Sequence, residues 1–297
     1  MTPTRHTRPA PRIGLWLVAA TALALWVGQY DLGVLFEAER RELAGERLLR
    51  FLAAFGAPDG SGEFLRRALG LAVDTVAMAV LGTLVGLLLG GLLGIAGSRA
   101  LVVNGCRSGL RRSVFASVAA IARLLQAVLR GVPDFAWAIL LIPLLDIGPL
   151  VGWCAIAISS AGIIGRVYSE ALDAAEGRVL EPLRNVGASR WALLCYGLLP
   201  AARGPMLSFA LLRWECNARN AAVIGAVGGG GLGSELLVRL EYGEYGKVLT
   251  LVALLLVITS GSDVVRRIVR GPGRGGSRSP EPVAHPAAGS AACYARP

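Results

Sequence analysis

Histidine is nearly absent from this chain of 297 residues, because only His6 and His285 occur and both lie in polar terminal segments. Without a histidine in the apolar segments, neither a serine–histidine pair nor a histidine–cysteine metal site can form there. The five cysteines include no C-x-x-C pair, and we interpret them as small apolar side chains. No G-x-x-x-x-G-K-[ST] sequence occurs either, which excludes a nucleotide-hydrolysing P-loop. We therefore predict no catalytic residue, no metal and no cofactor in this chain.

Charged residues are also scarce, at 17%, whereas 54% of the residues are hydrophobic and the mean hydropathy is +0.59. Soluble domains carry more charge and less apolar content. The net charge of +10 would suit nucleic acid. The arginines, however, concentrate in tails and in short loops beside apolar segments, as in the cytoplasmic loops of membrane proteins. We predict membrane lipid, and not nucleic acid, as the surrounding partner.

Several apolar segments approach the length of about 20 helical residues that a bilayer core requires. The first follows an arginine-rich start, but no small-residue cleavage site follows it, so we predict a retained helix. Loops rich in arginine and poor in acids lie on the cytoplasmic side, which places both termini there. The prediction is an all-α polytopic membrane protein with six transmembrane helices. The crossings are Ile13–Tyr30, Leu71–Gly97, Val132–Ile147, Leu150–Tyr168, Pro205–Val227 and Lys247–Val265.

The stretch from Ser113 to Arg130 leaves two alternatives open. It is apolar but contains Arg123 and ends on an arginine, so it either crosses the bilayer or lies along the inner face as an amphipathic helix. A separate crossing here would move the arginine-containing segment 169–203 to the outside, against the charge rule. We therefore favour the helix on the inner face.

Four glycines recur every four residues in the second predicted crossing: Gly82, Gly86, Gly90 and Gly94. On a helix they form one smooth stripe, on which another helix can lie close. The pattern predicts helix packing and no chemistry.

The chain divides by composition into four regions. Residues 1–12 form a cytoplasmic tail, and residues 13–68 hold the first transmembrane helix and an external amphipathic segment whose role is open. Residues 69–270 form the core, which includes a polar cytoplasmic segment at 169–203. Residues 271–297, rich in Gly, Ser, Pro and Arg, are predicted to be disordered.

The polar segment is predicted to form two short helices joined by an elbow. Pro182 suits the first turn of a helix, and Gly187 can end that helix with a positive φ. Ser189 can cap a second helix over residues 190–194, and Pro200 is expected to break the chain before the next crossing. An ordinary amphipathic loop is the alternative.

This segment resembles the cytoplasmic coupling loop of bacterial ABC importer permeases, E-A-A-x-x-x-G followed by I-x-L-P. Glu181, Gly187, Leu199 and Pro200 stand at the matching positions, whereas Pro182 and Leu183 replace the alanines and Gly197 replaces the isoleucine. The resemblance implies that the loop docks on a separate ATPase subunit, which binds ATP and Mg²⁺, and that the loop transmits the closure of that subunit. The implied coupling residues are Glu181, Arg184, Gly187, Ala188, Ser189, Leu199 and Pro200.

A second resemblance covers the penultimate crossing of phosphonate importer permeases, with R-F-E-x-N-x-R and V-L-G-x-V-G-x-G-G-I-G patterns. Residues 213–219 and 223–233 match them, and the likeness extends over residues 60–270. It implies a type I, MetI-like permease fold in a bacterial inner membrane, transport of phosphonate or a related phosphorus oxyanion by alternating access, and an extracytoplasmic solute-binding protein. Six crossings without internal duplication further predict a homodimer.

The same crossing contains three charged residues, Arg213, Glu215 and Arg219. Each isolated charge at mid-bilayer costs about 2.5–3.5 kcal/mol, so they need partners. Glu215 and Arg219 are four residues apart and can pair, whereas Arg213 needs a partner elsewhere. One alternative is a structural ion pair with Asn217 bridging helices, which we favour. The other is a polar lining that presents arginine to an anionic substrate. Asp134 receives no role.

The glycine run after this crossing precedes no Lys-Ser/Thr, which excludes a phosphate-binding P-loop. It is predicted to be a flexible external turn, and the resemblance implies that the binding protein docks there. It consists of Gly228, Gly229, Gly230, Gly231 and Gly233.

Two rival functions remain from the sequence. One is a permease for another small solute, such as methionine or a quaternary amine. The other, more remote, is an intramembrane enzyme using Ser159, Ser160 or Ser208, which would lack a histidine partner.

Overall fold

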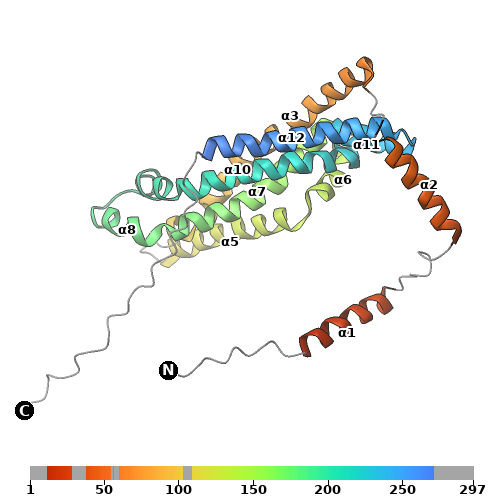
Figure 1. The fold of residues 1–297 in the computed structure, drawn as a ribbon. Helices are drawn as coiled ribbons and strands as arrows, with labels where there is room; N and C mark the ends of the chain where they lie inside the picture. The colour runs from red at the N-terminus through yellow and green to blue at the C-terminus, as the bar shows by residue number, and fades with distance from the viewer. Residues whose placement is uncertain (1–11, 29–37, 55, 57–59, 103–108, 271–297) are drawn as a thin grey trace, which may run out of the picture. The chain divides into compact units, whose positions relative to one another are not determined.

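The computed structural model describes residues 12–28, 38–54, 56, 60–102 and 109–270 (Figure 1). Within these ranges every regular element is helical. The chain divides into two units, residues 1–58 and 59–297. The all-α prediction is therefore confirmed, while the predicted disorder of residues 271–297 lies outside the described residues.

The first unit contains helices α1 (Arg12–Val27) and α2 (Ala38–Ala54). Helix α1 consists almost entirely of apolar residues and coincides with the first predicted crossing as far as that crossing is described. Helix α2 alternates charged and apolar residues, includes an exposed ion pair between Arg50 and Glu46 at 3.4 Å, and leaves leucines such as Leu49 exposed. These features match an amphipathic helix.

The second unit is a bundle whose centre is the pair α3 (Gly62–Gly97) and α7 (Pro149–Ala174). The glycine stripe of α3 lies directly against α7. A Cβ atom on any of the four glycines would come within 2.6–2.9 Å of a Cβ on α7, so only glycine permits this approach of the two backbones. The α7 residues that face the stripe are Ile156, Ser160, Ile164 and Tyr168.

After the short helix α4 (Arg99–Val102), helix α5 (Gly109–Gly131) and helix α6 (Asp134–Leu145) follow one another along α7. The C-terminal half of α5 is inside the bundle: the Gln126 amide donates to the Leu93 carbonyl at 2.8 Å, and the last turn contacts Gly162 at the middle of α7. Asp134 of α6 meets α7 at nearly the same level, through Ser159. By length and composition α5 is a candidate membrane span, and α6 follows it as a shorter apolar helix, so both alternatives for Ser113–Arg130 stay open.

The chain continues through α8 (Glu176–Asn185), α9 (Arg190–Ala192), the π-helical segment η2 (Leu193–Leu198) and α10 (Leu199–Ile224). Two proline predictions are wrong. Pro182 lies inside α8 and not in its first turn, and it is exposed, so water can satisfy the carbonyl that loses its partner. Pro200 does not break the chain, because the amide of Leu199 donates five residues back to Leu194 and this wider turn accommodates the ring.

A second π-helical segment, η3 (Gly225–Gly229), leads from α10 into α11 (Gly231–Glu241), and α12 (Tyr245–Arg270) completes the bundle. The glycine run at this corner is tightly packed, which corrects the flexible turn. Gly229, Gly231 and Gly233 are buried, and a Cβ on Gly233 would clash with the Ala222 carbonyl. Helix α11 was not predicted. It packs through Leu232 against Phe64 of α3.

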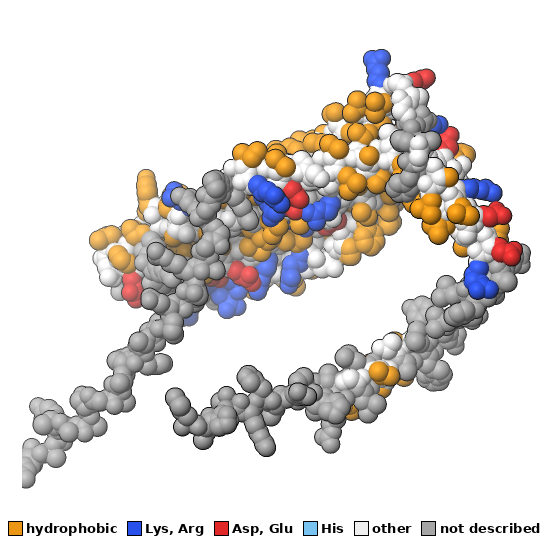
Figure 2. Space-filling model, in the orientation of Figure 1, with side chains coloured by type: hydrophobic (Ala, Val, Ile, Leu, Met, Phe, Trp, Pro, Cys, Tyr) orange, Lys and Arg blue, Asp and Glu red, His pale blue; other side chains and the backbone are white. Residues whose placement is uncertain are grey.

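Helices α3, α5, α7 and α12 are each long and apolar enough to cross a membrane. The helical stretch 190–229 and α11, bent by 61°, make a fifth candidate if they form one span, and α6 is a shorter apolar helix. Figure 2 shows hydrophobic side chains over much of the visible face of the bundle, with charged side chains gathered in a few places. The described residues thus form a multi-pass bundle that is compatible with six crossings but does not establish that number.

Candidate functional site

The elbow between α8 and α9 is a hydrogen-bonded turn centred on Gly187. This residue has φ of +74°, where side chains other than glycine are strained. Its amide donates to the Arg184 carbonyl at 3.0 Å, and the Ala188 amide donates to the Leu183 carbonyl at 3.1 Å, as in a Schellman cap. The Ser189 hydroxyl then accepts from the Ala192 amide at 3.3 Å and caps the next helix. The elbow therefore has one defined conformation.

A buried apolar cluster attaches the elbow to the bundle. Leu180 of α8 packs with Leu194 and Leu198 of η2, around Leu172 at the end of α7. The Arg184 guanidinium adds a hydrogen bond from Nη2 to the Ala100 carbonyl of α4 at 3.0 Å. Figure 1 shows α8 beyond the end of the bundle where α5 begins and α7 ends.

The opposite side of the elbow exposes large apolar side chains. Val186, Trp191 and Tyr196 are 79%, 74% and 80% exposed, and Glu181 is also exposed. Arg190 stacks over the Phe115 ring of α5 at 4.2 Å, which fixes the start of α9. Exposed apolar groups on a rigid, anchored segment are typical of a surface that binds another protein.

Asp173 joins four helices near the elbow. One carboxylate oxygen accepts from the Ser98 hydroxyl at 2.8 Å and from the Ala100 amide at 3.0 Å. The other pairs with Arg123 of α5 at 2.7 Å, and Arg123 also donates to the Gly97 carbonyl at 2.8 Å. Asp173 received no predicted role, because its partners are about 50 to 75 residues away along the chain.

A second polar group lies inside the bundle, around Arg213 of α10. Its Nε donates to the Ser160 hydroxyl at 3.1 Å, and its Nη2 donates to the Ser159 hydroxyl at 3.3 Å. The same Nη2 lies 3.4 and 3.3 Å from the two carboxylate oxygens of Asp134. Asp134, which received no role in the prediction, is thus the partner that Arg213 requires.

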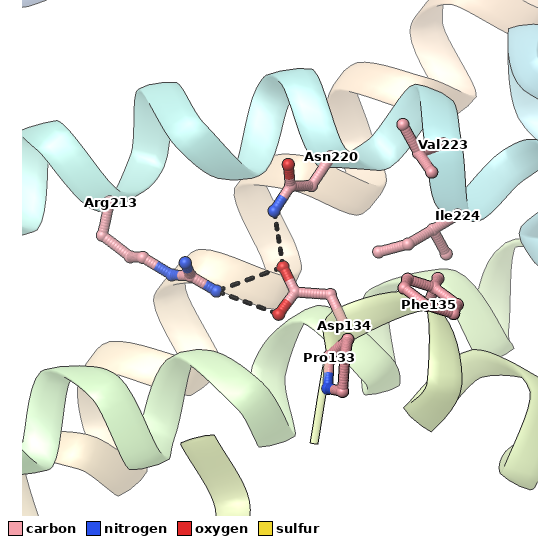
Figure 3. A pocket seen from close by; sticks show the side chains of 7 residues that line it. All are labelled: Pro133, Asp134, Phe135, Arg213, Asn220, Val223 and Ile224. Carbon is pink, nitrogen blue, oxygen red and sulfur yellow. Dashed lines mark hydrogen bonds and ion pairs between the residues drawn. The ribbon is translucent and has the colours of Figure 1, made fainter. Parts of the chain in front are cut away.

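Asp134 receives two further hydrogen bonds. Asn220 of α10 donates from Nδ2 at 2.6 Å, and the Ser159 hydroxyl of α7 contacts the other oxygen. A pocket of about 300 Å³ opens beside the carboxylate (Figure 3). Its polar lining consists of Asp134, Arg213 and Asn220, and its apolar wall consists of Pro133, Phe135, Val223 and Ile224.

Asn217 lies one helical turn after Arg213 in α10 and is fully buried. Its Nδ2 donates to the Thr83 hydroxyl of α3 at 2.9 Å and to the Ser160 hydroxyl of α7 at 3.0 Å. This amide bridges three helices and does not line the pocket.

Glu215 lies on another face of α10, toward α12. Its carboxylate pairs with Arg219 at 2.5 Å and with Arg266 of α12 at 2.6 Å, while Arg219 lies 4.0 Å from Asp263. Arg213 and Glu215 therefore belong to two separate networks.

Replacing Glu215 by glutamine should destabilise the joint between α10 and α12. The Glu215 side chain is only 8% exposed, and its loss leaves the guanidinium of Arg266, 25% exposed, without its anion. We expect a loss on the order of 2 kcal/mol, below that of a fully buried pair. Arg219→Gln, at a side chain 55% exposed, should cost less than about 1 kcal/mol. Unfolding measured in the same micelles gives the comparison, and equal losses from both variants would contradict it.

Comparison with known proteins agrees with this architecture. Residues 102–270, more than half of the chain, match the family described as binding-protein-dependent transport system inner membrane component. The chain belongs to this family. It is a multi-pass component of the inner membrane.

Curated relatives include the putative phosphite transport system permease protein HtxC of Stutzerimonas stutzeri, 29% identical over 65% of this chain and 64% of that protein. The phosphite transport system permease protein PtxC of the same organism is 28% identical over 67% of this chain and 68% of PtxC. The phosphate-import permease protein PhnE of Mycolicibacterium smegmatis is 30% identical over 69% of this chain but only 37% of PhnE. The chain thus spans about two thirds or less of the length of these relatives.

Among solved structures, the MetNI methionine ABC transporter in inward-facing conformations matches with a TM-score of 0.57 at 23% identity, over 71% of this chain and 98% of that chain. An amino acid ABC transporter with histidines matches with a TM-score of 0.54 at 16% identity, over 69% of this chain and 95% of that chain. At these identities the likeness concerns the fold alone, and it confirms the predicted MetI-like permease fold.

Proposed function

We propose that the chain is the permease subunit of an ATP-driven ABC importer for phosphonate or a related phosphorus oxyanion. Its family and the names of its curated relatives, which specify phosphite, phosphate or phosphonate transport, support this proposal. The chain itself acts as a transport subunit and not as an enzyme.

The observation that carries the proposal is the elbow. Its conformation is fixed by Gly187 and Ser189, and its buried leucines attach it to the bundle. Its exposed side bears Val186, Trp191 and Tyr196. A rigid lever of this kind can transmit the motion of a bound subunit into the helices. The subunit that binds it is an ATP-binding cassette ATPase, which supplies ATP and Mg²⁺ binding.

Three further parts complete the proposal. The elbow and both termini lie in the cytoplasm, as the arginine-rich loops indicate. A second copy of the chain forms the other half of the path, and the two copies rock between inward and outward openings. An extracytoplasmic solute-binding protein docks at the opposite end of the bundle, near the glycine corner between α10 and α11.

Uptake by proteoliposomes containing the permease, its ATPase and its binding protein tests the function. We expect ATP-dependent accumulation of labelled phosphite or methylphosphonate, and no accumulation of methionine or a quaternary amine. Uptake of methionine or the amine in place of the oxyanions would overturn the substrate class. Absence of ATP-dependent uptake of all these solutes would overturn the importer itself.

A further inference from the structure

We propose that Arg213, Asn220 and Ser159 form a cradle for a tetrahedral oxyanion, and that the Asp134 carboxylate occupies this cradle when no substrate is bound. The proposal rests on the proposed function and assigns its substrate contact. It concerns the pocket beside α6 and α10, and it gives Asp134 the part of a displaceable internal anion.

The donors converge on one point from two helices. Asn220 and Arg213 reach the carboxylate from α10, and Ser159 reaches it from α7. Figure 3 shows the Arg213 and Asn220 side chains directed at Asp134. Three donor side chains around one carboxylate make an anion-binding arrangement, and the oxygens of an oxyanion can use the same donors.

The ion pair between Arg213 and Asp134 involves only one nitrogen of the guanidinium group. A single nitrogen, Nη2, contacts both oxygens of Asp134 at 3.3 and 3.4 Å, longer than the charge-assisted bonds of about 2.7–2.9 Å. The parallel two-nitrogen fork that guanidinium forms with carboxylate or phosphate is absent between these groups. An oxyanion that enters the pocket can take up that fork geometry, which favours its exchange for the carboxylate.

The pocket provides space beside the donors. Its volume of about 300 Å³ is at the lower end of the range for ligand pockets, which suits a small solute. Phe135, Val223 and Ile224 form the apolar wall. Apolar surroundings lower the local dielectric and strengthen the attraction between an anion and Arg213. The cradle therefore selects small anions over neutral or zwitterionic solutes.

Asp134 is the first residue of α6, so a movement of the start of this helix would carry its carboxylate out of the cradle. Helix α6 has twelve residues and is separated from α5 by Val132 and Pro133 and from α7 by the turn at Asp146, which has φ of +61°. The indole of Trp137 forms a hydrogen bond back to α5, with Nε1 donating to the Leu129 carbonyl at 3.2 Å. Displacement of Asp134 by substrate would thus release the start of α6 from α10 and open the path.

Binding of phosphite to the purified permease–ATPase complex tests the cradle without requiring turnover. Asp134→Asn removes the competing anion, so we expect the Kd for phosphite to fall about tenfold, with a matching phosphite-dependent rise in Tm. Arg213→Lys retains the charge but not the fork, so its Kd should rise about tenfold. Arg219→Lys, on the same helix but outside the pocket, is the matched control and should bind as the unmodified complex does.

The outcomes separate this inference from the proposed function. If the unmodified complex transports phosphorus oxyanions while Asp134→Asn and Arg213→Lys, both folded, bind phosphite unchanged, the cradle is overturned and the function stands. If the unmodified complex neither binds nor transports phosphite, phosphate or methylphosphonate, both are overturned. Should Arg213→Lys fail to fold, the tighter phosphite binding expected for Asp134→Asn still tests the cradle. An unchanged Kd of Asp134→Asn for phosphite overturns it.

Discussion

Gly187→Val should reduce ATP-driven uptake to the level measured without ATP, while the bundle remains folded. Gly187 has φ of +74°, a conformation that a β-branched residue cannot adopt without strain. No atom lies within 4 Å of where a Cβ would be, so the substitution acts through the backbone alone and changes the angle between α8 and α9. The exposed side chains of the elbow would then no longer meet the ATPase as one surface.

Uptake by proteoliposomes and copurification of the ATPase measure this effect. Gly187→Asn is the matched control, because asparagine tolerates the left-handed conformation better than other residues with a side chain. It should retain most of the uptake. Unaltered uptake by Gly187→Val would refute the part of the elbow in coupling, provided that its Tm equals that of the unmodified protein.

Gly90→Leu should prevent α3 and α7 from packing and so destabilise the whole bundle. A Cβ at this position would lie 2.9 Å from the Cβ of Ile164 and 3.0 Å from the Ala161 carbonyl. The backbone of α7 cannot yield as a flexible side chain would, so the helices must separate. Because overpacking by a few methylenes costs about 1–3 kcal/mol and occasionally more, we expect a loss at or above the upper figure.

The neighbouring glycine supplies the control. Gly91 has no atom within 4 Å of a Cβ position, so Gly91→Leu introduces the same side chain without the clash. It should leave the unfolding midpoint in micelles unchanged or slightly raised, since leucine is the better helix former. Equal destabilisation by the two variants would show that the stripe does not decide the packing.

The two substitutions address different parts of the molecule. Gly90 sits where α3 and α7 touch, so its replacement by a larger residue acts on the packing of these two helices. Gly187 sits in the turn between α8 and α9, with no atom within 4 Å of a Cβ position. If both lose uptake but only Gly90→Leu loses stability, folding and coupling are separable in this protein.

Features that depend on neighbours along the chain could be read from the sequence. A glycine followed by a serine two residues later is sufficient for the turn at Gly187 and the cap at Ser189, because those hydrogen bonds are local. The pair of Glu215 with Arg219 follows from their separation by four residues on a helix. A four-residue glycine period likewise specifies a smooth helix face.

Features that join distant segments could not be read in the same way. Asp134 meets Arg213 across 79 positions and Ser159 across 25, and no local pattern in the sequence marks these pairs. The glycine run 228–231 has the composition of a flexible turn, yet tertiary packing buries Gly229 and Gly231 between α10 and α11. The apolar stretch 132–147 was predicted as one crossing, although the helix that forms there, α6, spans only the twelve residues Asp134–Leu145.

The sequence by itself determined that this is a helical membrane protein with a polar elbow, because hydropathy, charge distribution and capping residues act over one or two helical turns. The tertiary structure alone decided which partner compensates each intramembrane charge. That choice depends on how helices are brought side by side, and a buried ion pair forms wherever packing places two charges within reach of each other.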